Sequence, residues 1–272
     1  MEEKKLQWMK RNLYLNLNTG RFMKNFSKIE DNFYNDGFVV VRNILSKTSI
    51  RNIQKEIVKV KKISIKIKNP HLHLTQDNKI NTVHDINKYL KKGRIIQVSK
   101  DKKILNIIKN LLKANPKVRN IEFFSKPKKT GLKSPHHQDN YYWKFEDKKA
   151  LNVWIACDKS SKSNGGVFYL KGSHKSGLKK HVTSYAPGSS YKIPLHVIRK
   201  LKFEKIYPKL NPGDMLVHHC EVIHGSHENK SNKNRQGLVI SYKANNSKPN
   251  SKLLKDYKLN VKKNINFLSN NR

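Results

Sequence analysis

The sequence predicts a mainly β fold with flanking helices (α+β), whose strands build a sandwich or jelly roll. Short apolar and β-branched segments recur through the second half of the chain. Turns that contain glycine or proline separate them, such as Asn-Pro-Gly-Asp at residues 211–214. Two amphipathic helical segments precede these strands. Many short strands joined by such turns are typical of a sandwich or jelly roll.

The N-terminal region is expected to form helices around one strand. Residues 27–35 predict a short helix that ends at Gly37, and the β-branched residues 38–41 predict a strand. Ser46 is expected to cap a second helix, whose apolar residues share one face: Ile50, Ile53 and Ile57. We expect a third helix over residues 102–114, because its apolar residues again share a face: Ile104, Ile108, Leu111 and Leu112.

The remaining segments complete one predicted domain over residues 26–243. Residues 60–100 are rich in lysine, asparagine and histidine, and we expect an irregular lid or insertion there. Residues 1–25 are expected to form a polar arm or a short helix, and residues 244–272 a basic tail or a last weak helix. The predicted strands lie at residues 120–126, 135–143, 150–157, 166–170, 215–220 and 237–243.

Composition excludes several classes of protein. The 272-residue chain has 36% hydrophobic residues, enough to bury a core, but no apolar run approaches the roughly 20 residues that span a bilayer. The N-terminus lacks the continuous apolar stretch of a secretory signal. The two cysteines, Cys157 and Cys220, cannot form a disulfide framework. We therefore expect a cytoplasmic globular protein without a membrane span, and the sequence predicts no oligomeric state.

The charge of the chain is a weak guide to its partners. Fifty-eight basic and 19 acidic residues give a net charge of +39, which is typical of nucleic-acid binding. However, 49 of the basic residues are lysines and 9 are arginines, although arginine is the better ligand for phosphates and bases. Lysine, asparagine and isoleucine share A/T-rich codons. We favour codon bias over a selected anionic partner, and we expect weak, non-specific nucleic-acid binding.

A histidine and an aspartate stand two residues apart, at His137 and Asp139. On a strand, side chains at positions i and i+2 point to the same face. An imidazole and a carboxylate on one face are two thirds of the 2-His-1-carboxylate site of non-haem iron oxygenases. The pair alone is also typical of solvent-exposed residues, so a third ligand is needed.

The third candidate ligand is His224, which lies near the end of the β segment that follows residues 211–214. A polar loop leads from there to Arg235, and a hairpin of this length is expected to bring His224 and Arg235 close together. A cation beside a metal ligand requires an anionic third party. A dicarboxylate co-substrate would supply it, because its oxo-acid end chelates the metal and its distal carboxylate meets the guanidinium.

Taken in order, these motifs resemble the phytanoyl-CoA dioxygenase family of Fe(II)/2-oxoglutarate-dependent oxygenases. The resemblance extends over residues 26–243, and the spacing from His224 to Arg235 matches that of the family. It implies a double-stranded β-helix, the cupin-like jelly roll, with helices packed outside. The motifs are Gly37-Phe-Val-Val-Val, His137-Gln-Asp139 with Tyr142-Trp143, Asn152-Val-Trp154-Ile-Ala, Asn164-Gly-Gly166, Gly172-Ser-His-Lys175, Gly213-Asp214, His224-Gly-Ser226 and Arg235.

The resemblance implies that His137, Asp139 and His224 bind Fe(II). In related halogenases a small residue opens a halide site where this chain has Asp139, so the carboxylate favours hydroxylation. If the three side chains bind one metal, their ligand atoms must lie within about 5 Å of one another. The implied co-substrates are 2-oxoglutarate and O2, and the chemistry allows ascorbate as an accessory reductant.

The resemblance also implies a co-substrate pocket. Arg235 would bind the distal carboxylate of 2-oxoglutarate, Ser226 would donate a hydrogen bond to it, and Trp154 would line the pocket. Tyr142 and Trp143 are candidates for the substrate mouth, although an aromatic cluster is as often part of a core.

The other histidines are rival ligands with simpler explanations. His136 is expected to face away from His137, and His218 to pack or to contact a ligand from behind. Packing or capping accounts for His174, which follows a turn, and His219 is a further rival ligand. An exposed loop accounts better than a substrate lid for His71, His73 and His84.

The sequence therefore predicts a dioxygenase that hydroxylates a C–H bond of a small or medium-sized metabolite and releases succinate and CO2. The substrate would be a small molecule, and the basic chain favours an anionic one. Two alternatives are an oxidative demethylase of nucleic acid and a non-catalytic basic jelly-roll binding module. The excess of lysine over arginine counts against the first, and the complete set of site residues counts against the second.

Overall fold

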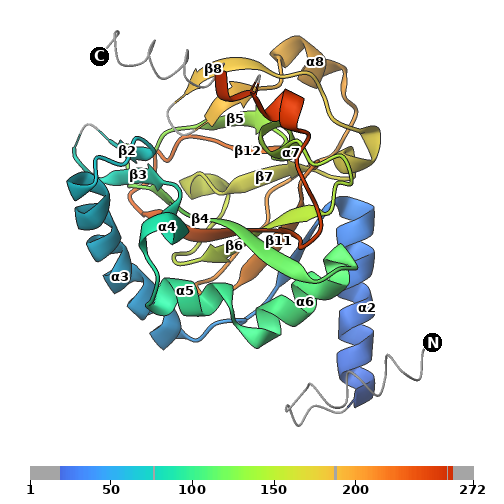
Figure 1. Cartoon of the computed structure of the whole chain (residues 1–272), viewed down its shortest axis with the longest axis horizontal. Helices are drawn as coiled ribbons and strands as arrows, with labels where there is room; N and C mark the ends of the chain where they lie inside the picture. Colours follow the sequence, from blue (N-terminus) through green and yellow to red (C-terminus); the bar gives the residue numbers. More distant parts are fainter. Residues whose placement is uncertain (1–18, 76, 187–188, 256, 260–272) are drawn as a thin grey trace.

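The computed structural model describes residues 19–75, 77–186, 189–255 and 257–259. Two antiparallel sheets face each other and form the predicted jelly roll (Figure 1). The larger sheet consists, in spatial order, of β1 (Phe38–Val41), β11 (Met215–His219), β6 (Ala150–Ala156), β13 (Arg235–Ala244), β4 (Pro116–Lys126), β3 (Ile80–Val83) and β2 (Leu72–Leu74). The smaller sheet consists of β10 (Lys205–Ile206), β7 (Val167–Leu170), β12 (His224–Ser226) and β5 (Ser134–His137).

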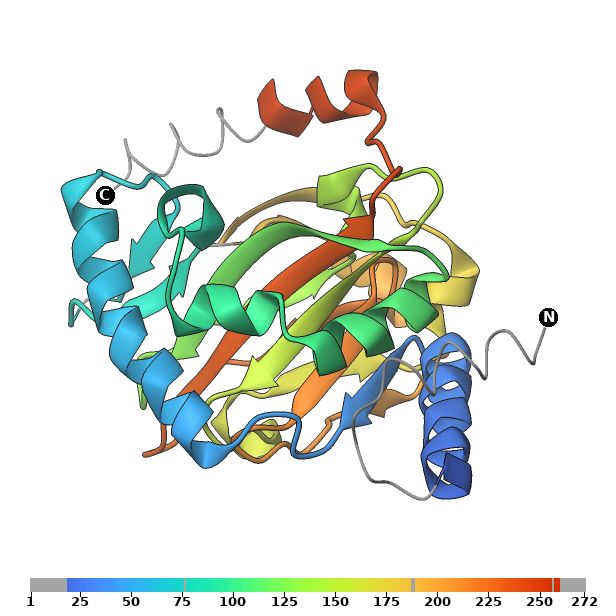
Figure 2. The same ribbon diagram turned by 60° about the horizontal axis from the view of Figure 1, so that its bottom comes forward.

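Helices cover the outer face of the larger sheet, where α3, α5 and α6 lie across the strands (Figure 2). The buried side chains of the helices and those on the helix-covered face of the sheet form the main hydrophobic core. These helices are α2 (Thr19–Asp36), α3 (Lys47–Lys66), α4 (Ile86–Tyr89), α5 (Arg94–Ser99) and α6 (Lys102–Leu112). A separate two-stranded sheet lies beside the smaller sheet, together with helix α8 (Leu195–Lys200) (Figure 1). It consists of β8 (Val182–Ala186) and β9 (Ser189–Lys192).

Local sequence signals placed most of these elements correctly. Ser46 caps α3 by accepting a hydrogen bond from the backbone N–H of Ser49, and the predicted isoleucine face of α3 is buried. Gly37 adopts φ +83° after α2, a conformation that favours glycine at the end of a helix. The predicted helix at residues 102–114 is confirmed as α6. Five of the six predicted strands are confirmed, at β4, β6, β7, β11 and β13.

The sixth predicted strand, at residues 135–143, is wrong beyond its first half. Strand β5 ends at His137, and α7 (Asn140–Trp143) begins directly after Asp139. Asp139 itself has helical backbone angles, φ −62° and ψ −35°. The alternation that predicts a shared face for positions i and i+2 therefore does not apply at this point of the chain.

The region at residues 60–100 is ordered rather than irregular. It contains the end of α3 and all of β2, β3, α4 and α5. Val83, Ile86, Ile95 and Val98 are fully buried, whereas Ile65 and Ile67 at the end of α3 are exposed. A short buried face of this kind produces no long hydrophobic period in the sequence.

Parts of the predicted N-terminal arm and C-terminal tail are helical. Helix α2 begins at Thr19, inside the predicted arm, and residues 1–18 lie outside the described part. Residues 251–255 of the predicted tail are helical, and residues 260–272 lie outside the described part. Within the described residues, no helix is both long and apolar enough to cross a membrane.

Candidate metal centre

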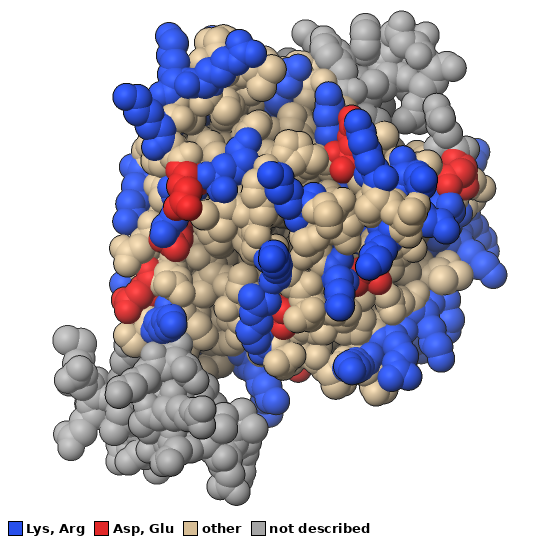
Figure 3. Space-filling view, turned by 180° about the vertical axis from the view of Figure 1, so that it is seen from behind, with Lys and Arg blue, Asp and Glu red and all other residues tan. Residues whose placement is uncertain are grey.

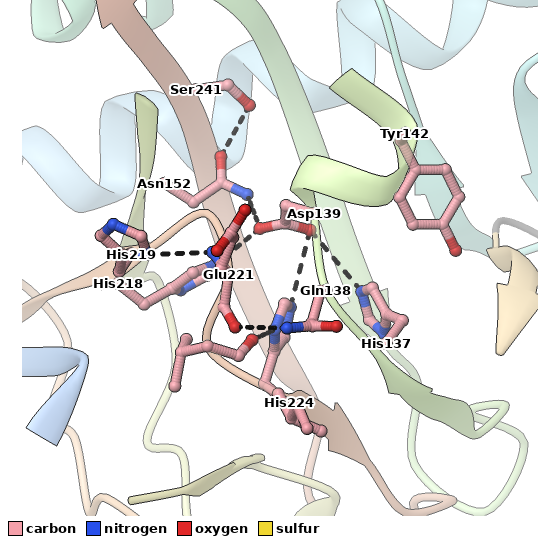
Figure 4. Close-up of polar contacts among 12 residues, drawn as sticks. His137, Gln138, Asp139, Tyr142, Asn152, His218, His219, Glu221, His224 and Ser241 are labelled. Carbon is pink, nitrogen blue, oxygen red and sulfur yellow. Dashed lines mark hydrogen bonds and ion pairs between the residues drawn. The ribbon is translucent and has the colours of Figure 1, made fainter. Parts of the chain in front are cut away.

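Two histidines and one aspartate converge between the two sheets. Strands β5 and β12 pair so that His137 lies directly opposite His224, with their ring centroids 4.2 Å apart. The turn after β5 then directs Asp139 toward both rings (Figure 4). Each Nε2 atom lies 3.7 Å from Oδ1 of Asp139, and the three ligand atoms lie within 4.8 Å of one another. These separations satisfy the predicted limit of about 5 Å.

Backbone carbonyls fix the tautomer of both histidines. Nδ1 of His137 donates a hydrogen bond to the carbonyl of Pro135 at 2.8 Å, and Nδ1 of His224 donates to that of Val222 at 3.0 Å. Because a carbonyl only accepts, the proton of each neutral ring lies on Nδ1. Burial lowers the pKa of each histidine to about 4. At neutral pH, therefore, both Nε2 atoms present a lone pair toward Asp139.

The carboxylate of Asp139 is held from behind by two donors. Nε2 of His218 donates to Oδ2 at 2.8 Å, and Nδ2 of Asn152 donates to the same oxygen at 2.7 Å (Figure 4). Ser241 in turn donates to Oδ1 of Asn152 at 2.6 Å, and Tyr169 donates to Nδ1 of His218 at 3.0 Å. Oδ1 of Asp139 is thus left to face the two histidines.

The electrostatics of the cluster favour a charged Asp139. Burial alone would raise the pKa of Asp139. The attraction of His224, which is protonated only at acidic pH, and the hydrogen bond from His218 outweigh burial, and the net shift of the pKa is downward. Two neutral imidazole nitrogens and one carboxylate oxygen are the ligand set of a facial 2-His-1-carboxylate iron site. The residues present therefore fit a bound Fe(II).

Sequence reasoning missed Asn152 and only partly anticipated His218. Their place depends on strand register: in the larger sheet His218 of β11 pairs with Asn152 of β6, and Asn152 pairs with Ser241 of β13. One sequence signal was available for Asn152, because it stands two residues before Trp154 in a predicted strand and so shares its face. Its contact with Asp139 depends on the packing of one sheet on the other.

A cavity of about 310 Å³ opens from the cluster, within the size range of small-molecule sites. Arg235 lies in its wall and is 2% exposed. One guanidinium nitrogen of Arg235 donates to the carbonyl of Gly165 at 3.1 Å, and its Nε has no hydrogen-bond partner. No described carboxylate forms a salt bridge with Arg235. A buried cation without an acid is costly, so this end of the cavity fits an anion.

The residues predicted around Arg235 line the same cavity, but the predicted hairpin is wrong. Ser226 is buried in β12, and Trp154 lies with its ring 5.5 Å from the guanidinium carbon of Arg235. Strand β12, which carries His224, belongs to the smaller sheet, whereas β13, which carries Arg235, belongs to the larger one. The loop between them crosses from one sheet to the other, and the two residues meet across the cavity instead of across a strand pair.

Lys126 is a second buried cation that the sequence did not reveal. It pairs with Arg235 in the register of β4 and β13, and its Nζ donates to the carbonyl of His227. Burial, and then the charge of Arg235, hold the pKa of Lys126 well below its usual range. One lysine among 49 has no distinguishing pattern in the sequence.

The aromatic candidates and the rival histidines are also placed. Tyr142 and Trp143 of α7 line the cavity, and the hydroxyl of Tyr142 donates to the carbonyl of Tyr191 at 2.9 Å. His136 packs against the ring of Phe168, away from the cluster. Three histidines expected in an exposed loop instead line the cavity mouth: His71, His73 and His84.

Comparisons with known proteins agree with this geometry. A family model described as phytanoyl-CoA dioxygenase matches residues 33–237. Peroxisomal phytanoyl-CoA dioxygenase of Homo sapiens is 26% identical over 226 residues, which cover 77% of this chain and 66% of that protein. Phytanoyl-CoA dioxygenase 1 of Oryza sativa subsp. japonica is 28% identical over 123 residues, which cover 45% of this chain and 43% of that protein. The chain spans less than two thirds of the length of either relative.

Solved structures with the same fold are similar over most of the chain. EctD from S. alaskensis with bound Fe has a TM-score of 0.67 at 18% identity, over 82% of this chain and 79% of that chain. The non-heme alpha ketoglutarate dependent carbocyclase SnoK from nogalamycin biosynthesis has a TM-score of 0.66 at 18% identity, over 81% of this chain and 84% of that chain. At these identities the likeness establishes a shared fold.

Proposed function

The chain belongs to the phytanoyl-CoA dioxygenase family, and on this premise we propose that it is an Fe(II)- and 2-oxoglutarate-dependent dioxygenase. It hydroxylates a C–H bond of a small or medium-sized metabolite and releases succinate and CO2. The observation that carries the proposal is the buried cluster of two Nε2 lone pairs and one free carboxylate oxygen at the cavity floor.

Each residue of the site has a defined task. His137, Asp139 and His224 hold the iron, and Arg235 with Ser226 holds the distal carboxylate of 2-oxoglutarate. The bound iron and its keto acid supply the activation of O2 for oxidation of a C–H bond. The carboxylate of Asp139 fills the position that is small in related halogenases, which supports hydroxylation as the outcome.

The walls of the cavity restrict water around the reacting atoms. Trp154 and Tyr169 are buried beneath the co-substrate end, and Trp143 is buried beside the metal ligands. Tyr169 also stacks on His224 with 5.7 Å between ring centroids, which fixes the plane of that ligand. A dry, rigid site strengthens the interaction of Arg235 with an anionic co-substrate.

The test compares two adjacent histidines in the full chain. After anaerobic loading with Fe(II), the wild type should bind one iron per chain and convert 2-oxoglutarate to succinate with a metabolite panel. His137→Ala should lose both properties, whereas His136→Ala should retain them, because His136 packs against Phe168. Iron binding and turnover that survive in His137→Ala would refute the assignment.

Nucleic acid is the second candidate substrate, and the net charge of +39 favours it. Figure 3 shows lysine and arginine side chains spread over the whole of one face, without a single continuous stripe. This distribution supports non-specific attraction, with dissociation constants of about 10⁻⁴–10⁻⁶ M at physiological salt. Binding about a thousandfold tighter that also stimulates 2-oxoglutarate turnover would favour the nucleic-acid demethylase.

A further inference from the structure

Strand β4 carries an extra residue, Arg119, that faces the cavity. Strands β4 and β13 pair in regular register until Ser241 opposes Asn120; the next pair is Tyr242 with Val118. Arg119 is therefore the unpaired residue of a β-bulge. Such bulges are frequent beside active sites, where they redirect a side chain.

The bulge changes which face of the sheet Arg119 occupies. In a regular strand Arg119 would share a face with Ile121 and Phe123, which are buried under the helices. Because of the bulge, Val118 packs against that core instead, and Arg119 lines the cavity. Its guanidinium carbon lies 5.0 Å from the ring centroid of Trp143, an arrangement that holds the planar group in place.

The acidic residues around Arg119 are already engaged. Glu122 accepts a hydrogen bond from Nδ1 of His84 at 2.6 Å, and Asp85 forms a salt bridge with Lys88 at 2.8 Å. The third nearby carboxylate is that of Asp139, which belongs to the metal ligand set. Within the described ranges, no carboxylate forms a salt bridge with Arg119, and burial lowers the pKa of this arginine. Its charge is available to a ligand.

Arg119 is well separated from the co-substrate subsite. Lys126, the residue opposite Arg235, lies seven residues after Arg119 in β4. At about 3.3 Å per residue this corresponds to roughly 20 Å along the strand. One small dicarboxylate held by Arg235 therefore does not reach Arg119. Arg119 lies toward the metal ligands, because Ser241, which is opposite Asn120, also pairs with Asn152, the residue that donates to Asp139.

We propose that the substrate carries an anionic oxygen group, a carboxylate or a phosphate, and that Arg119 binds it. Guanidinium is suited to both groups, because its N–H donors match paired oxygens in one plane. The inference rests on the proposed oxygenase function, since it names the substrate class of the same cavity. Arg119 fixes one end of the substrate, so that a C–H bond near the other end faces the metal ligands.

The test measures anion preference directly and requires no known substrate. Full-length protein loaded with Fe(II) and saturating 2-oxoglutarate is titrated anaerobically, by calorimetry, with 3-phenylpropionate, phenyl phosphate and neutral 3-phenylpropanol. The wild type should bind at least one of the anions about tenfold or more tightly than the alcohol, the effect of one desolvated charge pair. Arg119→Gln should abolish this preference, and Arg119→Lys should retain part of it.

The matched control is Lys133→Gln, an exposed cation at the rim of the same cavity that should leave the preference unchanged. Equal affinity for anions and alcohol in the wild type, including no measurable binding, would overturn the proposal. So would a preference that persists in folded Arg119→Gln. Iron content and 2-oxoglutarate affinity, measured on the same samples, show separately whether the proposed function itself has failed.

Discussion

Replacing Arg235 by glutamine should weaken 2-oxoglutarate binding and leave iron binding nearly unchanged. Arg235 is 2% exposed, and among the described residues its guanidinium donates only to the carbonyl of Gly165. The anion that it binds would therefore be fully desolvated. Removing one partner of such a pair costs about 2–5 kcal/mol. Since about 1.4 kcal/mol corresponds to a factor of ten, the dissociation constant should rise about 30-fold to several thousand-fold.

The assay is an anaerobic titration of the iron-loaded protein with 2-oxoglutarate, together with a separate iron titration. Arg235→Lys should give an intermediate affinity, because lysine retains the charge but lacks the bidentate geometry. Arg199→Gln, an exposed position on α8, is the control for removal of one positive charge. An unchanged 2-oxoglutarate affinity in Arg235→Gln would refute the assigned role, and a parallel loss of iron would indicate a structural role instead.

Three further predictions concern the surroundings of the site. Asn152→Ala removes one of the two donors to the metal-binding aspartate, so iron affinity in a competition titration should fall about 10–100-fold; unchanged affinity would contradict this role. Gly237→Ala places a Cβ 2.1 Å from Cζ2 of Trp154 and should lower stability by about 1–3 kcal/mol in thermal denaturation, with weaker 2-oxoglutarate binding; a wild-type melting curve would contradict the packing. Burial lowers the pKa of His84, but the charge of Glu122 and the hydrogen bond that His84 donates to it outweigh burial, and the pKa is raised. The stability lost in His84→Gln should therefore be largest below about pH 6.5 and shrink as pH rises through the raised pKa, as measured by urea unfolding at several pH values.

The sequence was most informative where structure depends on near neighbours. The caps and faces of α3 and α6, and five of the six strands, follow from patterns within one segment. The metal cluster was also located, although one step of the reasoning fails. The pairing of β5 with β12 positions His137, whereas Asp139 has helical angles, so a tight turn, instead of strand alternation, directs Asp139 toward His137.

Contacts between segments far apart in the chain were the ones that sequence reasoning could not reach. Asn152 and His218 contact Asp139 because three strands are in register and the two sheets pack together. Lys126 lies opposite Arg235 by the pairing of β4 with β13. Lys126 carries no local signal that separates it from the other lysines of the chain. The shared face of Asn152 and Trp154, and the place of His218 in a predicted strand, do not reveal which carboxylate the two residues contact.

The bulge in β4 illustrates the same limit and has the larger consequence. In the loaded site, Fe(II) and Asp139 together leave one positive charge, and Arg235 adds a second. The two carboxylates of 2-oxoglutarate neutralise both charges. Lys126 lies opposite Arg235 at the co-substrate end, roughly 20 Å along the strand from Arg119. An anionic substrate at the other end of the cavity therefore requires a cation of its own. Arg119 supplies that cation only because one unpaired residue moves it from the helix-covered face of the sheet to the cavity.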